Sequence, residues 1–237
     1  MRTVIMMAGT GSDDDYLRRS FGPAVAAAGG ALRALPPTAR LIEDYTTALD
    51  DAAAQARADG QQIVVGGVSI GAVVAVRWVL DRRGADCAGV LAALPPWSGP
   101  AGDSLAALSA RLTADAIERD GLEPTVAAMA ASSPEWLAAE LSRSWRALAA
   151  RDLVGQLRTA ARYPAPTPDQ IAHLTVPMAV VGAPDDPLHP IAVARSWAEA
   201  APRAALVESP LTEWGPREHR LGRACLSAWR SLTGDGG

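Results

Sequence analysis

Short apolar runs alternate along the chain with longer amphipathic stretches, a pattern typical of parallel β-α-β units. The runs predict strands at residues 3–7, 31–35, 62–66, 89–94, 178–181 and 204–208. The stretches between them, whose apolar positions recur at helical spacing, predict helices at residues 15–28, 41–59, 72–83, 190–200 and 216–232. We expect an α/β protein with a doubly wound, mostly parallel six-stranded sheet, and a ligand site beyond the C-terminal ends of its strands.

One region interrupts the alternation. Residues 97–168 contain no strand pattern and are predicted to form three or four helices. Ser132 and Glu135 stand at the spacing of a capping box, which predicts a helix start between them. The predicted organisation is therefore an α/β core made of residues 1–96 and 169–237, with residues 97–168 inserted as a helical lid.

Composition and charge exclude several classes of protein. The 237 residues are 49% apolar and 20% charged, as in ordinary globular proteins. All 22 basic residues are Arg, and 26 acidic residues leave a net charge of −4, which does not suit nucleic-acid binding. No apolar run is long enough for a membrane span, and the apolar stretch 4–7 is too short for a signal peptide. Cys87 and Cys225 could form at most one disulfide, so we expect a cytoplasmic protein. The expected partner is a small-molecule substrate, and the sequence does not specify the oligomeric state.

A candidate nucleophile lies between a predicted strand and a predicted helix. The sequence Gly67-Val68-Ser69-Ile70-Gly71 follows the apolar run 63–65 and precedes the helical stretch 72–80. A serine held on a sharp strand-to-helix turn needs small neighbours two positions before and after it. The following helix N-terminus favours negative charge that develops on a substrate oxygen. We therefore predict that Ser69 is a nucleophile.

A serine nucleophile requires a base and an acid. Asp185 and Asp186 follow the strand predicted at residues 178–181, so either carboxylate can lie at the C-terminal edge of the sheet. Here the chain resembles the α/β-hydrolase family, in which the acid often sits in a G-x-x-D-P-x-x-P context. Gly182 is one residue further away than in that pattern, and Asp186-Pro187-Leu188-His189-Pro190 matches the rest. The resemblance favours Asp186 as the acid. Asp185 is the alternative acid, and its other expected role is to cap the loop.

Three histidines compete for the role of base. His173 precedes the strand that carries the acid, and is expected to be a surface or lid-edge residue. His189 is only three residues beyond Asp186, where a local hydrogen bond or packing explains it. His219 follows the last predicted strand, where the resemblance places the base, and it is therefore our predicted catalytic histidine.

The loop after the first strand, Met7-Ala8-Gly9-Thr10-Gly11-Ser12, is made of small residues and is predicted to form an oxyanion hole. The amides of Thr10 and Ile70 are the predicted donors. This loop departs from the H-G or P-G opening that is usual in the resembling family. The acidic residues 13–15 that follow are expected to cap a helix and to disfavour an anionic substrate.

The resemblance implies a serine esterase or thioesterase that works through an acyl-enzyme. Predicted substrate-binding residues, in or beside the lid, are Trp97, Met129, Trp136, Trp145 and Tyr163, whose alternative role is to form the lid's own core. No metal-ligand spacing, dinucleotide motif or phosphate loop is visible in the sequence, so no cofactor is expected. The same catalytic residues also support C–C bond hydrolysis or cofactor-free perhydrolysis, and a non-catalytic ligand-binding homologue is a further alternative.

Overall fold

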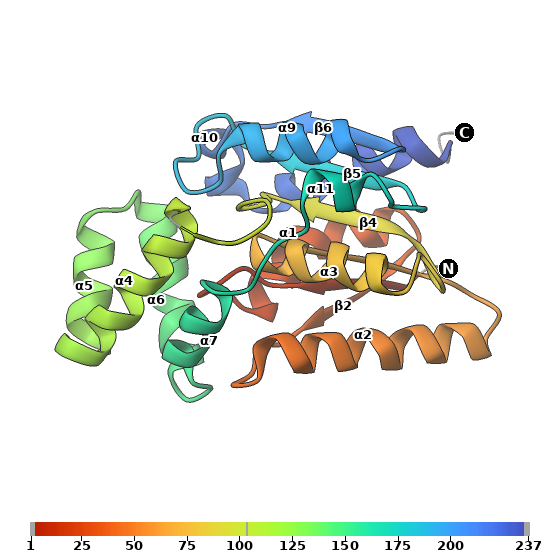
Figure 1. Ribbon diagram of the computed structural model, residues 1–237. Coiled ribbons are helices and arrows are strands. Elements are labelled where there is room, and N and C mark those ends of the chain that lie inside the picture. The colour runs from red at the N-terminus through yellow and green to blue at the C-terminus, as the bar shows by residue number, and fades with distance from the viewer. Residues whose placement is uncertain (1–2, 103, 235–237) are drawn as a thin grey trace.

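The computed structural model describes residues 3–102 and 104–234, in which helices cover both faces of a six-stranded sheet (Figure 1). The strands are β1 (Thr3–Met7), β2 (Ala31–Leu35), β3 (Ile63–Val68), β4 (Cys87–Ala93), β5 (Met178–Gly182) and β6 (Ala204–Glu208). Every neighbouring pair is parallel, and the strand order is β2-β1-β3-β4-β5-β6. The predicted fold class is confirmed, and each predicted strand is present within a few residues of its expected bounds.

The helices of the α/β core follow the strands in alternation. They are α1 (Asp14–Ala27), α2 (Leu41–Ala58), α3 (Ile70–Asp81), α8 (Pro168–Ile171), α9 (Ile191–Ala200), α10 (Leu211–Trp214) and α11 (His219–Thr233). The last predicted helix begins later than expected, because residues Gly215–Arg217 form a separate 3-10 turn before α11. No helix in the described part of the chain is both long enough and apolar enough to cross a membrane.

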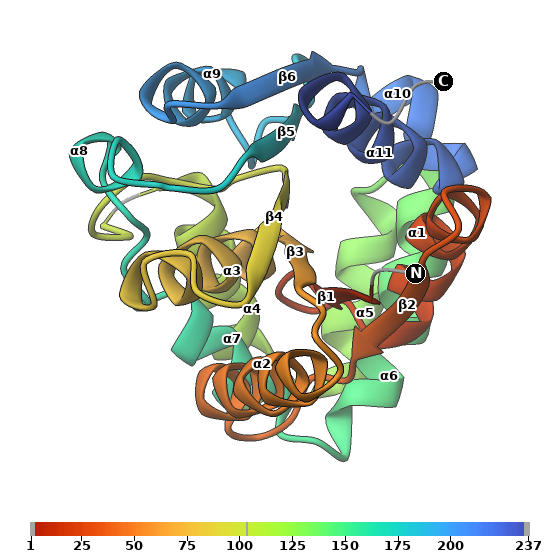
Figure 2. The ribbon, with the colours of Figure 1, turned by 90° about the vertical axis from the view of Figure 1, so that its right-hand side faces the viewer.

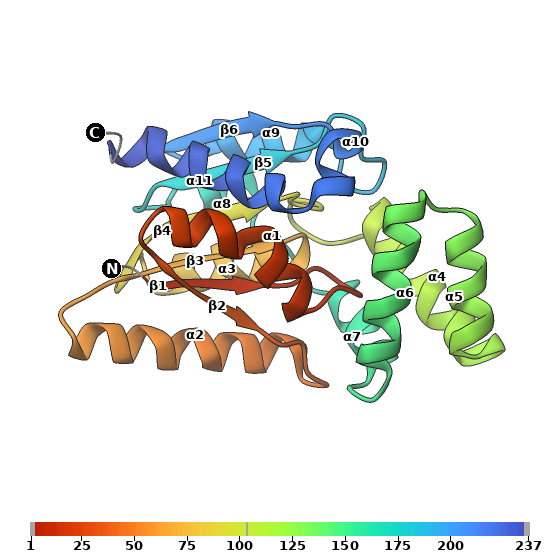
Figure 3. The same cartoon turned by 180° about the vertical axis from the view of Figure 1, so that it is seen from behind.

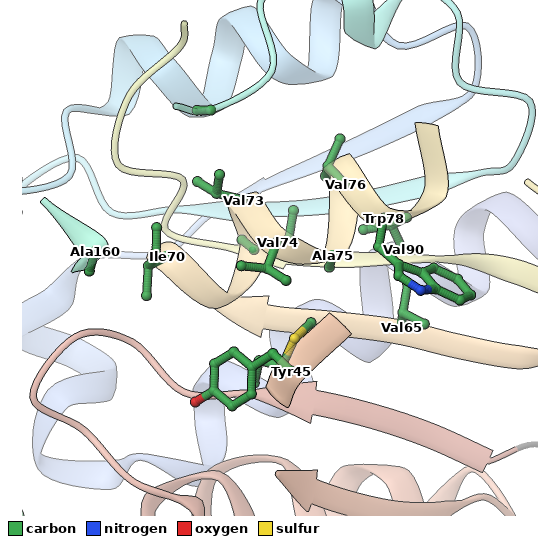
Figure 4. Packing of buried hydrophobic residues seen from close by; sticks show 14 of the residues in the cluster. Tyr45, Val65, Ile70, Val73, Val74, Ala75, Val76, Trp78, Val90 and Ala160 are labelled. Atoms are coloured by element: carbon green, nitrogen blue, oxygen red, sulfur yellow. The ribbon is translucent and has the colours of Figure 1, made fainter. Parts of the chain in front are cut away.

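The two faces of the sheet bury different sets of side chains, because successive strand residues point to opposite sides. Ile5 and Val65 pack with α2, α3 and α9 on one face, whereas Val4 and Val64 pack with α1 and α11 on the other (Figure 2). Figure 4 shows the first of these clusters, in which α3 and Tyr45 of α2 are buried against the sheet. The central strands are therefore apolar on both sides, which explains why they appear in the sequence as continuous apolar runs.

Five helices lie between β4 and β5 in the described chain, and the first four of them lie beyond the C-terminal ends of the strands (Figure 3). These four are α4 (Leu105–Asp120), α5 (Leu122–Ala131), α6 (Glu135–Ala149) and α7 (Leu153–Ala160). The expected capping box is not formed, because the Ser132 hydroxyl donates to the carbonyls of Ala128 and Met129 at the end of α5. α6 begins at Glu135, with Pro134 in the N-cap position.

The direction in which strands are added reverses between β1 and β3. The chain passes from β1 to β2 at one edge, crosses back to β3 on the other side of β1, and then continues to β6. In a parallel sheet, the loops after two such strands diverge and leave a crevice at the C-terminal edge. The loops that follow β1 and β3 contain Gly9–Ser12 and Ser69, which places both predicted parts of the site at this crevice.

Candidate active site

Ser69 lies on a strained turn between β3 and α3. Its φ of 54° and ψ of −117° belong to a region that non-glycine residues rarely adopt. The turn also brings backbones together: a Cβ on Gly67 would lie 2.3 Å from the backbone of Gly71, and a Cβ on Gly71 would lie 2.3 Å from the carbonyl oxygen of Met7. The two glycines of the predicted motif are therefore required by close packing, and the turn presents the Ser69 hydroxyl at the edge of the sheet.

A histidine and an aspartate complete a hydrogen-bonded chain that begins at Ser69. The Nε2 atom of His189 lies 3.0 Å from Ser69 Oγ, and its Nδ1 atom lies 2.8 Å from Asp186 Oδ2. An ionised Asp186 accepts a hydrogen bond from the Nδ1–H group, which leaves Nε2 free to accept a proton from the serine. This is the geometry that activates a serine hydroxyl.

The predicted base, His219, is corrected by this geometry. His219 is the exposed first residue of α11 and is not among the residues that line the cavity around Ser69. The loop after β6 contributes Leu211 and Trp214 to that cavity instead. The prediction relied on the chain order of the resembling family. In the structure His189 reaches the serine from the loop after β5. The local hydrogen bond expected for His189, which it makes to Asp186, is therefore part of the site.

The segment 186–189 folds so that the acid orients its own histidine. Asp186 Oδ1 accepts hydrogen bonds from the backbone amides of Leu188 and His189, at 2.8 and 3.2 Å. Burial alone would raise the pKa of Asp186, but the hydrogen bond and the electrostatic attraction from His189 and these two amides together lower it. The carboxylate therefore stays ionised at neutral pH, as the orienting acid must.

Asp185 has the loop-capping role that was considered for it. Its carboxylate accepts hydrogen bonds from the amides of Leu211 and Thr212 and from the Thr212 hydroxyl, at 2.5, 3.1 and 2.8 Å respectively. Asp185 thus joins the loop after β5 to the start of α10, and Asp186 faces the histidine.

The predicted oxyanion loop is a tight turn against the serine. The amide of Ser12 donates to the carbonyl of Gly9 at 3.0 Å, and Gly11 has the positive φ, 75°, that glycine adopts readily in such turns. A Cβ on Gly9 would lie 3.4 Å from Ser69 Cβ. Thr10 therefore occupies the turn next to the nucleophile, and Ile70, as the first residue of α3, has an amide without an acceptor inside its helix.

A cavity of about 240 Å³ opens over Ser69 and His189. Its walls are mostly apolar and come from the turn after β1, from α4 and α6 of the insertion, and from the loop after β6. Its larger side chains are Tyr16, Leu94, Trp97, Trp136, Leu137, Leu141, Trp145, Leu157, Leu188, Leu211 and Trp214. Within the described residues no arginine lines this cavity, and Glu140 is the only carboxylate there besides Asp186. Glu140 is paired with Arg19 and Arg143.

The structure places three of the five predicted substrate-binding residues, Trp97, Trp136 and Trp145, around the cavity. Met129 and Tyr163 are not among its lining residues; Met129 packs against the core, and the Tyr163 carbonyl accepts the indole N–H of Trp97 at 3.3 Å. Trp214 was not predicted, although it lines the cavity and its ring centroid lies 6.3 Å from that of Trp136. Its position in the loop after the last strand was the available signal.

No protein-family model and no curated protein matches the sequence. Solved structures do match. An esterase from Thermogutta terrifontis has 17% identity and a TM-score of 0.71, with 98% of this chain and 90% of that chain covered. An esterase from Exiguobacterium antarcticum has 12% identity and a TM-score of 0.73, with 96% and 91% covered. A bromoperoxidase from Bacillus anthracis has 14% identity and a TM-score of 0.70, with 97% and 92% covered.

The chain has the α/β-hydrolase fold. Sequence identities this low establish the fold and not the reaction, because one fold supports many reactions. Within this α/β-hydrolase fold, Ser69 follows the third strand in the chain and Asp186 follows the fifth. The histidine shares a loop with the acid, so residues from only two loops form the hydrogen-bonded chain at the nucleophile.

Proposed function

We propose that this protein is a serine hydrolase that cleaves a neutral, apolar carboxylic ester or thioester through an acyl-enzyme. The observation that carries the proposal is the continuous hydrogen-bonded chain from Ser69 through His189 to Asp186, beside an apolar cavity. At these distances, a histidine oriented by an ionised carboxylate can act as general base toward a buried serine nucleophile.

The proposed reaction has two halves. The Ser69 oxygen attacks the acyl carbonyl while His189 takes its proton, and the amides of Thr10 and Ile70 stabilise the oxyanion. His189 then donates that proton to the leaving alcohol or thiol, which departs. In the second half, His189 takes a proton from water, the resulting hydroxide attacks the acyl-enzyme, and Ser69 regains its proton from the histidine. Asp186 holds the imidazole with Nδ1 protonated throughout.

Charge and polarity around the cavity support an uncharged acyl group. An anionic acyl chain would find no arginine on the walls formed by the described residues, and both guanidinium groups near Glu140 are already paired with carboxylates. Leu188 lines the cavity and is partly exposed, and α4, which supplies part of the cavity wall, also carries the exposed side chains of Leu105, Leu108 and Leu112. These leucines favour a substrate with an aliphatic part.

We also infer that the inserted residues 97–168 act as a lid over the serine. Residues of α4 and α6 supply one wall of the cavity, so the insertion would cover part of an acyl group bound at Ser69. Cofactor-free perhydrolysis is a second candidate, because the structural neighbours include bromoperoxidases. In that reaction hydrogen peroxide, instead of water, attacks the acyl-enzyme and yields a peracid.

The test is hydrolysis of p-nitrophenyl esters of graded chain length and of acyl-CoA thioesters by the wild type and by Ser69→Ala. We expect turnover by the wild type, loss of several powers of ten in Ser69→Ala, and an acyl mass adduct on the acid-quenched wild type only. Peracid formation on addition of hydrogen peroxide would identify perhydrolysis. Equal turnover by both proteins would contradict the proposed nucleophile, and no turnover on any substrate would favour a non-catalytic binding protein.

A further inference from the structure

Three consecutive residues of α6 contact the turn that follows β1. The Ser144 hydroxyl donates to the carbonyl of Gly11 at 2.7 Å, and Ser144 is fully buried. The Arg143 guanidinium donates two hydrogen bonds to the two carboxylate oxygens of Asp13, each at 2.8 Å. The indole of Trp145 lies against Gly11, where a Cβ would be 2.7 Å from its Nε1 atom. The insertion therefore contacts the turn at its carbonyl, at its glycine and at the residue that follows it.

The Asp13 side chain links these contacts to the helix behind the turn. It is 5% exposed, and it accepts the amide of Tyr16 at 3.1 Å as the N-cap of α1. Burial would raise the pKa of Asp13, but the hydrogen bonds from Arg143 and Tyr16 and the charges of Arg143 and Arg19 together lower it. A buried carboxylate needs such a partner, and the forked geometry of arginine fixes its direction as well as its charge.

The turn is held on its other side by the nucleophile itself. Gly9 packs against Ser69 and Val68, so the turn is enclosed between the serine and α6. The amide of Thr10 lies in this enclosed turn, between the residue that contacts the nucleophile and the residue that contacts the insertion. An oxyanion donor must be placed within a fraction of an ångström of its working position, and loops need support to achieve this.

We propose that α6 sets the oxyanion donor. Arg143 and Ser144 are positioning residues: their bonds to Asp13 and Gly11 fix the turn Gly9–Ser12 so that the Thr10 amide faces the substrate oxygen as negative charge develops on it. The insertion then takes part in the chemistry as well as forming the wall of the cavity. This inference rests on the proposed hydrolase function, because it assigns residues to the oxyanion hole of that reaction.

The test uses Ser144→Ala, Arg143→Lys and the double variant Asp13→Asn/Arg143→Met. The double variant removes both charges of the Asp13–Arg143 pair, Glu140 keeps its ion pair with Arg19, and asparagine retains the cap of α1. Arg146→Met is the matched control, because Arg146 lies on the same helix but pairs with Glu123 at the surface of the insertion. Rates are expressed per reactive serine, counted by titration with a fluorophosphonate, so that a misfolded fraction does not affect them.

We expect kcat to fall by about 10- to 100-fold in Ser144→Ala and in the double variant, since a displaced donor costs less than a deleted one. KM should change little, Arg143→Lys should fall between the wild type and the double variant, and Arg146→Met should match the wild type. The inhibition constant of a trifluoromethyl ketone, which forms an oxyanion on Ser69, should rise by the factor by which kcat/KM falls.

If α6 had a purely structural role, the variants would have a lower melting temperature and fewer titrated serines, but the wild-type kcat per serine and inhibition constant. This result would overturn the inference. Unchanged kcat in all three variants would overturn it as well. Both outcomes leave the proposed function intact if the wild type hydrolyses esters and Ser69→Ala does not. Equal rates in the wild type and Ser69→Ala would instead refute the function on which the inference rests.

Discussion

Asp186 and His189 are three residues apart, and this spacing is what makes a base and its orienting acid possible on one loop. The Asp186 carboxylate accepts two amides of its own loop through one oxygen and the imidazole through the other. The sequence contains a signal for this arrangement: an aspartate that bonds to amides two and three residues further on turns the chain back toward itself. The chain order of the resembling family predicted His219 instead. The position of the histidine along the chain depends on which loop carries it, and the reaction requires only that it reach the serine.

The two adjacent aspartates should respond differently to substitution. Asp186→Asn should lower kcat by about 10⁴-fold, because the amide favours the wrong tautomer of His189. Asp185→Asn should leave kcat within a few-fold of the wild type, since its partners are the amides at the start of α10. Steady-state kinetics of the two variants on one ester measures the difference. The opposite ranking would assign the orienting role to Asp185.

The positions of the strands could be predicted from the sequence, whereas the insertion could be predicted only to be helical. β3 and β5 are buried on both faces, so their apolar runs stand out in the sequence. The exact helix starts were less predictable: Ser132 has the residue type of an N-cap, but it is the C-cap of α5, and Pro134 takes the N-cap position of α6. Which tryptophans face the cavity depends on how α6 packs across the sheet edge, and this is a tertiary property that helical spacing does not specify.

Trp136 and Trp145 of α6 should respond differently to truncation. Trp136 is half-buried and lines the cavity beside Trp214, so Trp136→Ala should enlarge the cavity and shift the preference from p-nitrophenyl acetate toward octanoate. Trp145 is buried in the core cluster, so Trp145→Ala should lower the free energy of unfolding by about 3–5 kcal/mol. Kinetics on both esters and urea unfolding of both variants separate the roles. Identical effects of the two truncations would contradict this assignment.

The Asp13–Arg143 pair gives the contact between α1 and α6 a definite pH dependence. The pKa of Asp13 is lower in the folded protein than its ordinary value, so its contribution to stability is complete above about pH 4, the unfolded value, and is lost as the pH falls through the folded value. Asp13→Asn should therefore cost about 1–3 kcal/mol near neutral pH. The cost should shrink toward zero in strong acid. Urea unfolding of both proteins across this range tests the pair, and a pH-independent difference would contradict it.

At the scale of the whole molecule, the site depends on strand order. β1 and β3 are neighbours although they are not consecutive, so the crevice between their C-terminal ends receives the turn Gly9–Ser12 and Ser69. β5 lies two strands from β3, and the loop after it crosses to the serine with both Asp186 and His189. The alternation of strands and helices predicted this edge as the site, but the path of each loop across it could be seen only in three dimensions.

We claim that His189 activates Ser69, and the rate at which a fluorophosphonate labels the serine measures this activation directly. His189→Ala and His219→Ala are compared with the wild type, with Ser69→Ala as the blank. We predict that His189→Ala labels at least about 10³-fold more slowly, whereas His219→Ala labels at the wild-type rate. Slow labelling of His219→Ala together with wild-type labelling of His189→Ala would contradict the claim.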